Sequence, residues 1–160
     1  MPELLTTALN ALAAWDVAQA LTQGRWSYAG VSALHLLGIA LLVGGILPLD
    51  LRLLGLWPSV EMRALAGVLT PMAIVGLLLA AATGVLLFSV RPLEYAQLPV
   101  LWAKLALIAL GTAGALAFRL RIGRDPGRAG RRLRLLAGVG SIVAWLGALT
   151  LGRLIAFTNA

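Results

Sequence analysis

The sequence contains no cysteine, only six acidic residues and one histidine. Without cysteine the chain can form no disulfide, no thiolate metal site and no cysteine nucleophile. Charged residues make up 12% of the chain, against roughly 25% in soluble domains. Hydrophobic residues make up 61% of its 160 residues, and a soluble domain of that size has too small a core to bury them. The composition therefore predicts an integral membrane protein whose surface faces the lipid bilayer.

The positive charge is concentrated in one place. Seven of the 13 basic residues lie in RLRIGRDPGRAGRRLR, residues 119–134, and the net charge is +7. A basic loop beside a hydrophobic segment is typical of membrane orientation, so we expect no nucleic-acid partner. Residues 1–20 carry Glu3 and Asp16 but no basic residue. That charge is wrong for the start of a cleaved signal peptide, and none is expected here.

Four apolar stretches are long enough to cross a bilayer as helices, because about 20 residues span about 30 Å of hydrocarbon. Strict alternation of apolar and polar residues, the pattern of membrane strands, is absent. The predicted fold is all-α, an integral membrane four-helix bundle forming a single domain over residues 1–160. The predicted spans are 28–49, 65–89, 99–120 and 134–157.

The N-terminal stretch differs from these spans. Residues 3–21 place leucines along one stripe, but Asn10, Asp16 and Gln19 interrupt any surface that could face lipid. This pattern predicts a helix lying in the membrane interface, with a fifth span as the alternative.

The arginine distribution predicts the orientation of the chain. The positive-inside rule places the loop 119–134 in the cytoplasm. With four spans, both termini then lie on the outer side, which is the periplasmic face of a bacterial inner membrane.

Small residues mark the faces that are expected to pack, because membrane helices approach each other through them. They predict a compact bundle. The positions are Gly38 and Gly45 in the first span, Gly76, Ala80 and Gly84 in the second, Gly111 and Ala115 in the third, and Ser141, Ala144, Ala148 and Gly152 in the fourth.

Two ionisable residues, His35 and Lys104, lie in the outer half of their predicted spans. Helical rise puts them at depths of about 10 Å and about 7 Å, and Thr83 reaches a similar depth. Tyr28 shares a helical face with His35, and Glu94 is the carboxylate nearest to this level. Ionisable groups in a bilayer usually face a partner or a cavity, so these five residues form the candidate site.

The opposite end of the first span carries Asp50 and Arg52. We expect this pair to interact with Arg63 or Glu61 across the first loop. Ser59 is a residue type that caps helix N-termini, so it is expected to begin the second span.

Four roles for His35 are compatible with the sequence. It could donate a packing hydrogen bond, ligate the iron of haem b, donate to or relay a proton for a quinone, or bind a transported metal ion such as copper. In the haem interpretation, Lys104 meets the propionates. Met72 lies too far toward the cytoplasmic end to be a second axial ligand, which leaves a five-coordinate haem or one at a subunit interface. No hydrolase, zinc-protease or phosphate-loop motif is present, which argues against those classes of enzyme. The sequence does not decide whether the protein is an enzyme of another class.

Several short motifs resemble a bacterial inner-membrane four-helix family of unknown function. They are His35, the glycine pair 44–45, DLRLLG at 50–55, TGVLLF at 83–88 and LWAK at 101–104. The resemblance covers residues 28–120. More distantly, the chain is similar to copper-resistance D proteins and HemJ-type protoporphyrinogen oxidases, which implies haem association with His35 and Lys104 at the matching positions. The chain departs from those groups in having no second histidine.

Together these observations predict a membrane redox protein, or a subunit of a redox complex, that binds haem b or quinone near the outer leaflet. An accessory membrane subunit without a cofactor and a permease for metal or small solutes are the alternatives. Homo-oligomers and complexes with other redox subunits are equally compatible with the small-residue faces.

Overall fold

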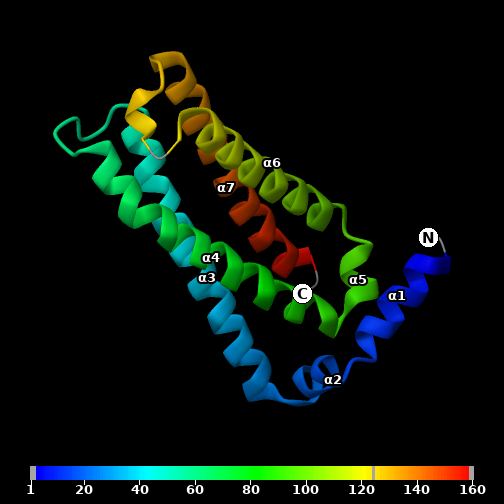
Figure 1. The fold of residues 1–160 in the computed structure, drawn as a ribbon. Helices are drawn as coiled ribbons and strands as arrows, with labels where there is room; N and C mark the ends of the chain where they lie inside the picture. The colour runs from blue at the N-terminus through cyan, green and yellow to red at the C-terminus, as the bar shows by residue number, and fades with distance from the viewer. Residues whose placement is uncertain (1–2, 124, 159–160) are drawn as a thin grey trace.

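The computed structural model describes residues 3–123 and 125–158, and the regular elements in this part of the chain are all helical (Figure 1). Four of the helices are long and apolar enough to cross a membrane, namely α3, α4, α6 and α7. The all-α class and the four long apolar helices are thus confirmed. In chain order the elements are α1 (Glu3–Ala13), α2 (Asp16–Gln23), α3 (Arg25–Leu53), α4 (Met62–Val90), α5 (Pro92–Ala96), α6 (Pro99–Ile122), the 3-10 turn η1 (Pro126–Arg128) and α7 (Arg131–Thr158).

The long helices extend beyond the predicted spans at most of their ends. α4 runs without interruption through Pro71. Its N-cap is Glu61, whose side chain makes no capping hydrogen bond. The prediction that Ser59 caps this helix was wrong, because Ser59 lies in the turn that precedes the helix and Glu61 is the N-cap.

The N-terminal stretch forms two helices instead of one. The chain breaks at Trp15, which has an extended backbone, and α2 begins at Asp16. The break lets the two apolar stripes pack on different partners, because α1 lies against α5 and α4 whereas α2 lies against α4 and α3. Leu9 of α1 and Leu21 of α2 are the large side chains buried by these contacts.

The long helices form two hairpins, in which α3 packs along α4 and α6 packs along α7 (Figure 1). The hairpins are joined mainly through α3 and α7. Their shared core consists of Leu42, Ala73 and Trp145, with Ile108 of α6 packed against it. All four long helices therefore meet at this one level, which we call the waist.

Glycines bring α3 and α4 into backbone contact. A Cβ atom on Gly38 would lie 2.6 Å from the backbone nitrogen of Ala80, and one on Gly45 would lie 2.8 Å from the carbonyl oxygen of Leu69. A Cβ on Gly76 would overlap the backbone of Leu42. These contacts confirm that the small residues of the first two spans face each other, and we call this contact the glycine seam.

The second hairpin uses glycine to accommodate large side chains. The indole of Trp145 lies against Gly111, where a Cβ would be 3.0 Å from the ring. Leu107 occupies the space beside Gly147 in the same way, at 2.8 Å. Trp145 is only 5% exposed, so this indole fills the centre of the waist.

A cleft of about 1120 Å³ lies between the hairpins on the arginine-rich side of the waist, and residues of all four long helices line it. Its walls include small residues such as Ala66 and Gly67 of α4 and Gly114 and Ala115 of α6. Side chains of this size do not reach across the gap, and α4 makes no extended contact with α6. The arrangement thus differs from the compact bundle expected from the sequence.

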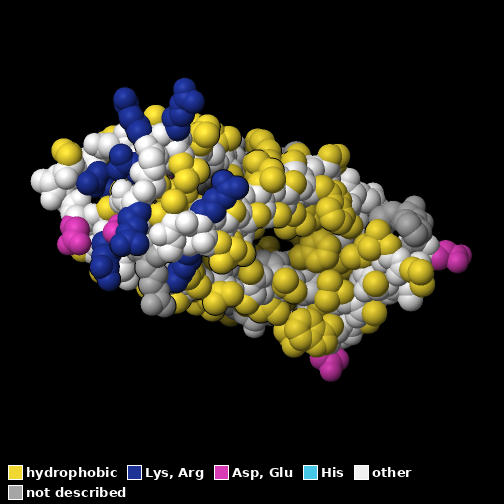
Figure 2. Space-filling view, turned by 45° about the horizontal axis from the view of Figure 1, so that its top comes forward, with side chains coloured by type: hydrophobic (Ala, Val, Ile, Leu, Met, Phe, Trp, Pro, Cys, Tyr) yellow, Lys and Arg dark blue, Asp and Glu magenta, His cyan; other side chains and the backbone are white. Residues whose placement is uncertain are grey.

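The surface is apolar along the long helices, and the basic side chains gather at one end (Figure 2). We call the end that holds the 119–134 loop the arginine end, and the opposite one the α5 end. Trp26 and Trp102 lie near the α5 end and are 87% and 55% exposed, as tryptophans at a membrane interface would be.

The glycine seam predicts that α4 tolerates a methyl group at one glycine and not at another. Gly76→Ala should destabilise the protein by about 1–3 kcal/mol, because the methyl group forces the two backbones apart. Gly67→Ala makes the same chemical change in the same helix, with no atom within 4 Å of the new Cβ, and should leave stability unchanged or slightly raised. Thermal unfolding in detergent measures both, and equal melting temperatures for the two variants would contradict the seam.

Candidate functional site

His35 of α3 is hydrogen-bonded to Thr83 of α4. The distance between His35 Nδ1 and Thr83 Oγ1 is 3.0 Å. Thr83 is only 4% exposed, so the bond crosses a buried part of the α3–α4 contact. The structure therefore brings together two of the five predicted site residues.

The hydrogen-bond network assigns the tautomer of the imidazole. Thr83 Oγ1 lies 2.6 Å from the carbonyl oxygen of Leu79, and a hydroxyl has one proton to donate. Because that proton goes to the carbonyl, Thr83 accepts from His35, and Nδ1 carries a proton. The carbonyl of Ala80 is a second acceptor beside the ring. With Nδ1 protonated, a neutral His35 has its lone pair on Nε2.

Gly84 provides the space in which the ring lies. A Cβ at this position would be 3.2 Å from His35 Cε1. Any larger residue would press on the imidazole and its hydrogen bond. The sequence TG at positions 83–84 thus has two local roles, since threonine accepts the ring proton and glycine admits the ring.

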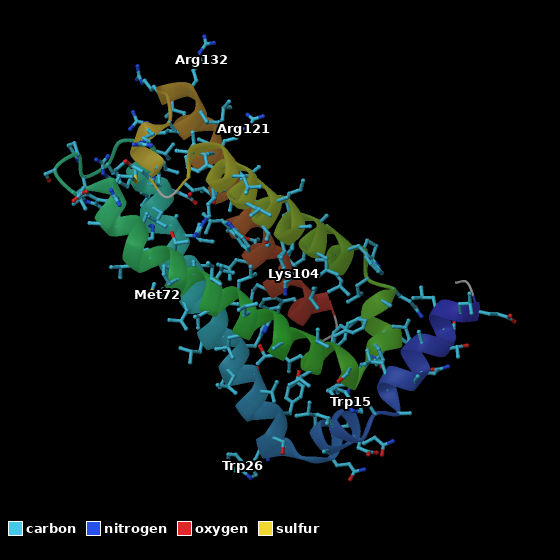
Figure 3. The ribbon with its side chains drawn as sticks, viewed as in Figure 1. Trp15, Trp26, Met72, Lys104, Arg121 and Arg132 are labelled. Carbon is cyan, nitrogen blue, oxygen red and sulfur yellow. The ribbon has the colours of Figure 1, made fainter. Side chains whose placement is uncertain are left out.

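Lys104 of α6 points into the molecule and lies against α7 (Figure 3). A Cβ on Gly152 would be 3.1 Å from Lys104 Nζ and 3.3 Å from Cε. The ammonium group is close enough to act electrostatically on His35, and it forms no ion pair with the described carboxylates. A third predicted residue, from the second hairpin, thus lies within electrostatic range of His35.

Tyr28 lies about 10 Å along α3 from His35, where it neighbours Tyr95 of α5. Burial raises the pKa of Tyr95 above the ordinary tyrosine value, and the adjacent Tyr28 raises it further. The Tyr95 ring also contacts Phe88, with 6.2 Å between centroids. Tyr28 therefore belongs to an aromatic cluster with Tyr95 and Phe88 at the α5 end.

Glu94 lies at the surface, where it forms an ion pair with Arg91. Its Oε2 is 3.4 Å from Arg91 Nη1, and both side chains are more than half exposed. The sequence suggested that this carboxylate could reach His35 and Lys104. The structure instead directs it toward the arginine at the start of the same short turn.

Met72 lies far from His35, as expected from the sequence. Its Cε is 3.8 Å from the place where a Cβ on Gly44 would be, and Gly44 lies about 13 Å from His35 along α3. Within the described residues, no three metal-binding side chains of His, Cys, Asp or Glu type come together. The described residues therefore hold no cluster of protein ligands that could bind a metal ion without a cofactor.

The expected pairing of Asp50 and Arg52 with Glu61 or Arg63 was wrong. Arg52 donates hydrogen bonds to the carbonyl oxygens of Val60 and Pro58 in the loop. Asp50 is 5% exposed and lies beside Ser141 of α7. The reason is the α3–α7 contact, which covers Asp50 and which no local sequence pattern indicates. The only signal in the sequence was an acidic residue within an apolar run.

Comparisons of the chain with models of known protein families, with curated proteins and with solved structures found no match. The resemblance to the four-helix family, to copper-resistance D proteins and to HemJ-type oxidases therefore stays a prediction.

Proposed function

We propose that the protein is a redox protein of the bacterial inner membrane that binds haem b through Nε2 of His35. The observation that carries this proposal is the hydrogen bond between His35 Nδ1 and Thr83. Histidines that ligate metals commonly donate their other ring N–H to a fixed acceptor, which sets the tautomer and orients the ring. Thr83 provides that acceptor, and its own bond to Leu79 holds it in place.

Lys104 supplies the positive charge that an anionic cofactor needs inside a membrane. Haem carries two propionates, and an unpaired ammonium near the imidazole is suited to bind one of them. When bound, haem would supply one-electron chemistry at its iron. The chain itself would hold the ring nitrogen and the propionate partner on separate hairpins, so the cofactor would also tie the hairpins together.

His35 is the one histidine of the chain, so any second histidine on the iron would have to come from another chain. A homo-oligomer or another redox subunit would supply it.

Quinone is the second candidate cofactor, and the single imidazole favours it. A quinol needs one base to accept its hydroxyl proton and one cation to stabilise the resulting oxygen anion. His35 Nε2 and Lys104 Nζ are groups of these two kinds. Oxidation of the quinol to the quinone releases two protons and two electrons. His35 would accept one proton, the second would pass to the aqueous phase, and the two electrons would pass to a redox partner subunit.

The proposed orientation places the arginine end in the cytoplasm and both termini in the periplasm. The accumulation of basic residues at that end (Figure 2) supports it. Gln97 and Gly130 are exposed residues at opposite ends of the molecule, and the native chain has no cysteine. Each can therefore carry a single reporter thiol.

The orientation predicts opposite labelling of Gln97→Cys and Gly130→Cys in spheroplasts. A membrane-impermeant maleimide should label the first variant directly and the second only after permeabilisation. The cysteine-free parent chain is the control for background. Labelling of Gly130→Cys in intact spheroplasts would reverse the proposed topology.

The haem proposal predicts a visible spectrum that depends on His35. Protein purified in detergent from haem-replete cells should show a Soret band that shifts on reduction with dithionite. His35→Ala should lose the band, and Lys104→Met should keep the fold but retain less haem. Met72→Leu is the control and should match the native protein.

A colourless native protein, or a Soret band of equal intensity in His35→Ala, would contradict haem ligation by this residue. In the colourless case, quinone extracted from the native protein and missing from His35→Ala would favour the second candidate.

A further inference from the structure

The cleft at the arginine end has features that the proposed redox site does not use. Neither His35 nor Lys104 lines it, and its volume of about 1120 Å³ exceeds the roughly 300–1,000 Å³ of ordinary ligand pockets. Protein interiors are close-packed, and an apolar space of this size left empty is costly. In a membrane, a molecule from the bilayer would fill it.

The opening of the cleft faces sideways. The turn η1 packs against both α4 and α6, and Gly123 and Pro126 line the cleft from that loop. The loop thus covers the arginine end of the cleft, and the waist closes the other end at Trp145. The remaining route is the gap between α4 and α6, through which a lipid in the surrounding leaflet could enter without crossing water.

Three glycines in the cleft wall have no packing partner within 4 Å of a Cβ built on them. Gly67, Gly114 and Gly140 line the cleft from three helices, and at each of them a Cβ would meet no atom within 4 Å. Glycine inside a helix costs about 1 kcal/mol relative to alanine. In the glycine seam, glycine is needed because the backbone of the neighbouring helix lies where a side chain would be. At Gly67, Gly114 and Gly140 no protein atom occupies that place, and the space belongs to the cleft.

The charged residues that line the cleft, within the described part of the chain, are Arg63, Arg119 and Asp50. Arg63 lies in the first turn of α4 and Arg119 in the last turn of α6, so two arginines line the cleft from different helices. Asp50 is only 5% exposed. Its Oδ2 atom has no hydrogen-bond partner among the described residues. A complementary ligand therefore carries an anion, a hydrogen-bond donor and a long apolar body.

We propose that this cleft binds one anionic phospholipid with a hydroxylated headgroup, of the phosphatidylglycerol type. The phosphate would lie between Arg63 and Arg119, a headgroup hydroxyl would donate to Asp50, and the acyl chains would fill the space between the hairpins. This proposal rests on the proposed membrane insertion and not on haem binding, so a colourless protein would leave it intact.

The test is lipid binding to purified, delipidated protein, measured by native mass spectrometry and by thermal stabilisation. Phosphatidylglycerol should bind with one site per chain. Phosphatidylmethanol, which has the same charge but no hydroxyl, should bind several-fold more weakly, and phosphatidylcholine more weakly still. Soluble glycerol phosphate should not bind, which separates a lipid site from a free phosphate site.

Variants locate the site. Arg63→Gln and Arg119→Gln should each weaken phosphatidylglycerol binding about fivefold, whereas Arg121→Gln, an exposed arginine outside the cleft, should not. Gly114→Leu fills the cleft from its wall and should reduce binding, with helix content followed by circular dichroism. If that variant does not fold, Gly67→Leu fills the cleft from the α4 wall instead.

Three results would overturn the proposal: equal binding of phosphatidylglycerol and phosphatidylcholine, equal losses in Arg121→Gln and the cleft variants, or undiminished binding in the folded cleft-filling variant. Equal binding of phosphatidylglycerol and phosphatidylmethanol would remove Asp50 from the site. The cysteine-labelling experiment tests membrane orientation separately, so failure here can be distinguished from failure of the topology.

Discussion

The close approach of α3 and α4 is the constraint on which the rest of the structure depends. Gly38, Gly45 and Gly76 remove the side chains that would otherwise separate the two backbones. Only at this separation can the short side chain of Thr83 reach the imidazole of His35, at 3.0 Å. Because lipid tails are as apolar as leucine, such packing and such interhelical hydrogen bonds are the main forces that join helices in a bilayer. The glycine seam therefore supports both the fold and the site.

The waist divides the molecule into two regions with different chemistry. On one side, His35 and Lys104 come from different hairpins and offer a ring nitrogen and an ammonium group to a cofactor. On the other, an apolar cleft lies between the hairpins, and two arginines line it. Trp145 lies between the two regions and contacts Gly111 of the neighbouring helix. The contact between α3 and α7 holds the hairpins together. A ligand bound on either side of the waist would therefore act on this same contact.

Much of the fold was predictable from the sequence, because helix length and apolar composition depend only on local residues. The contact of His35 with Thr83 was partly predictable, since depth along a helix follows from residue number. The position of Asp50 was not, because its burial depends on α7, which lies about 90 residues further along the chain. The cleft was also missed. Small residues indicate where helices can approach, but Gly67 and Gly114 show that they do not indicate whether a protein helix fills the space.

The availability of His35 Nε2 is the central claim, and nitrogen NMR of the single histidine tests it most directly. A chain made with ¹⁵N-labelled histidine and a histidine-free affinity tag would give signals from one imidazole. In the ligand-free protein at mildly alkaline pH, the nitrogen shifts should show a protonated Nδ1 and an unprotonated Nε2. Thr83→Val should weaken this preference because it removes the acceptor. A proton on Nε2 in the native protein, or a tautomer unaffected by Thr83→Val, would contradict the account.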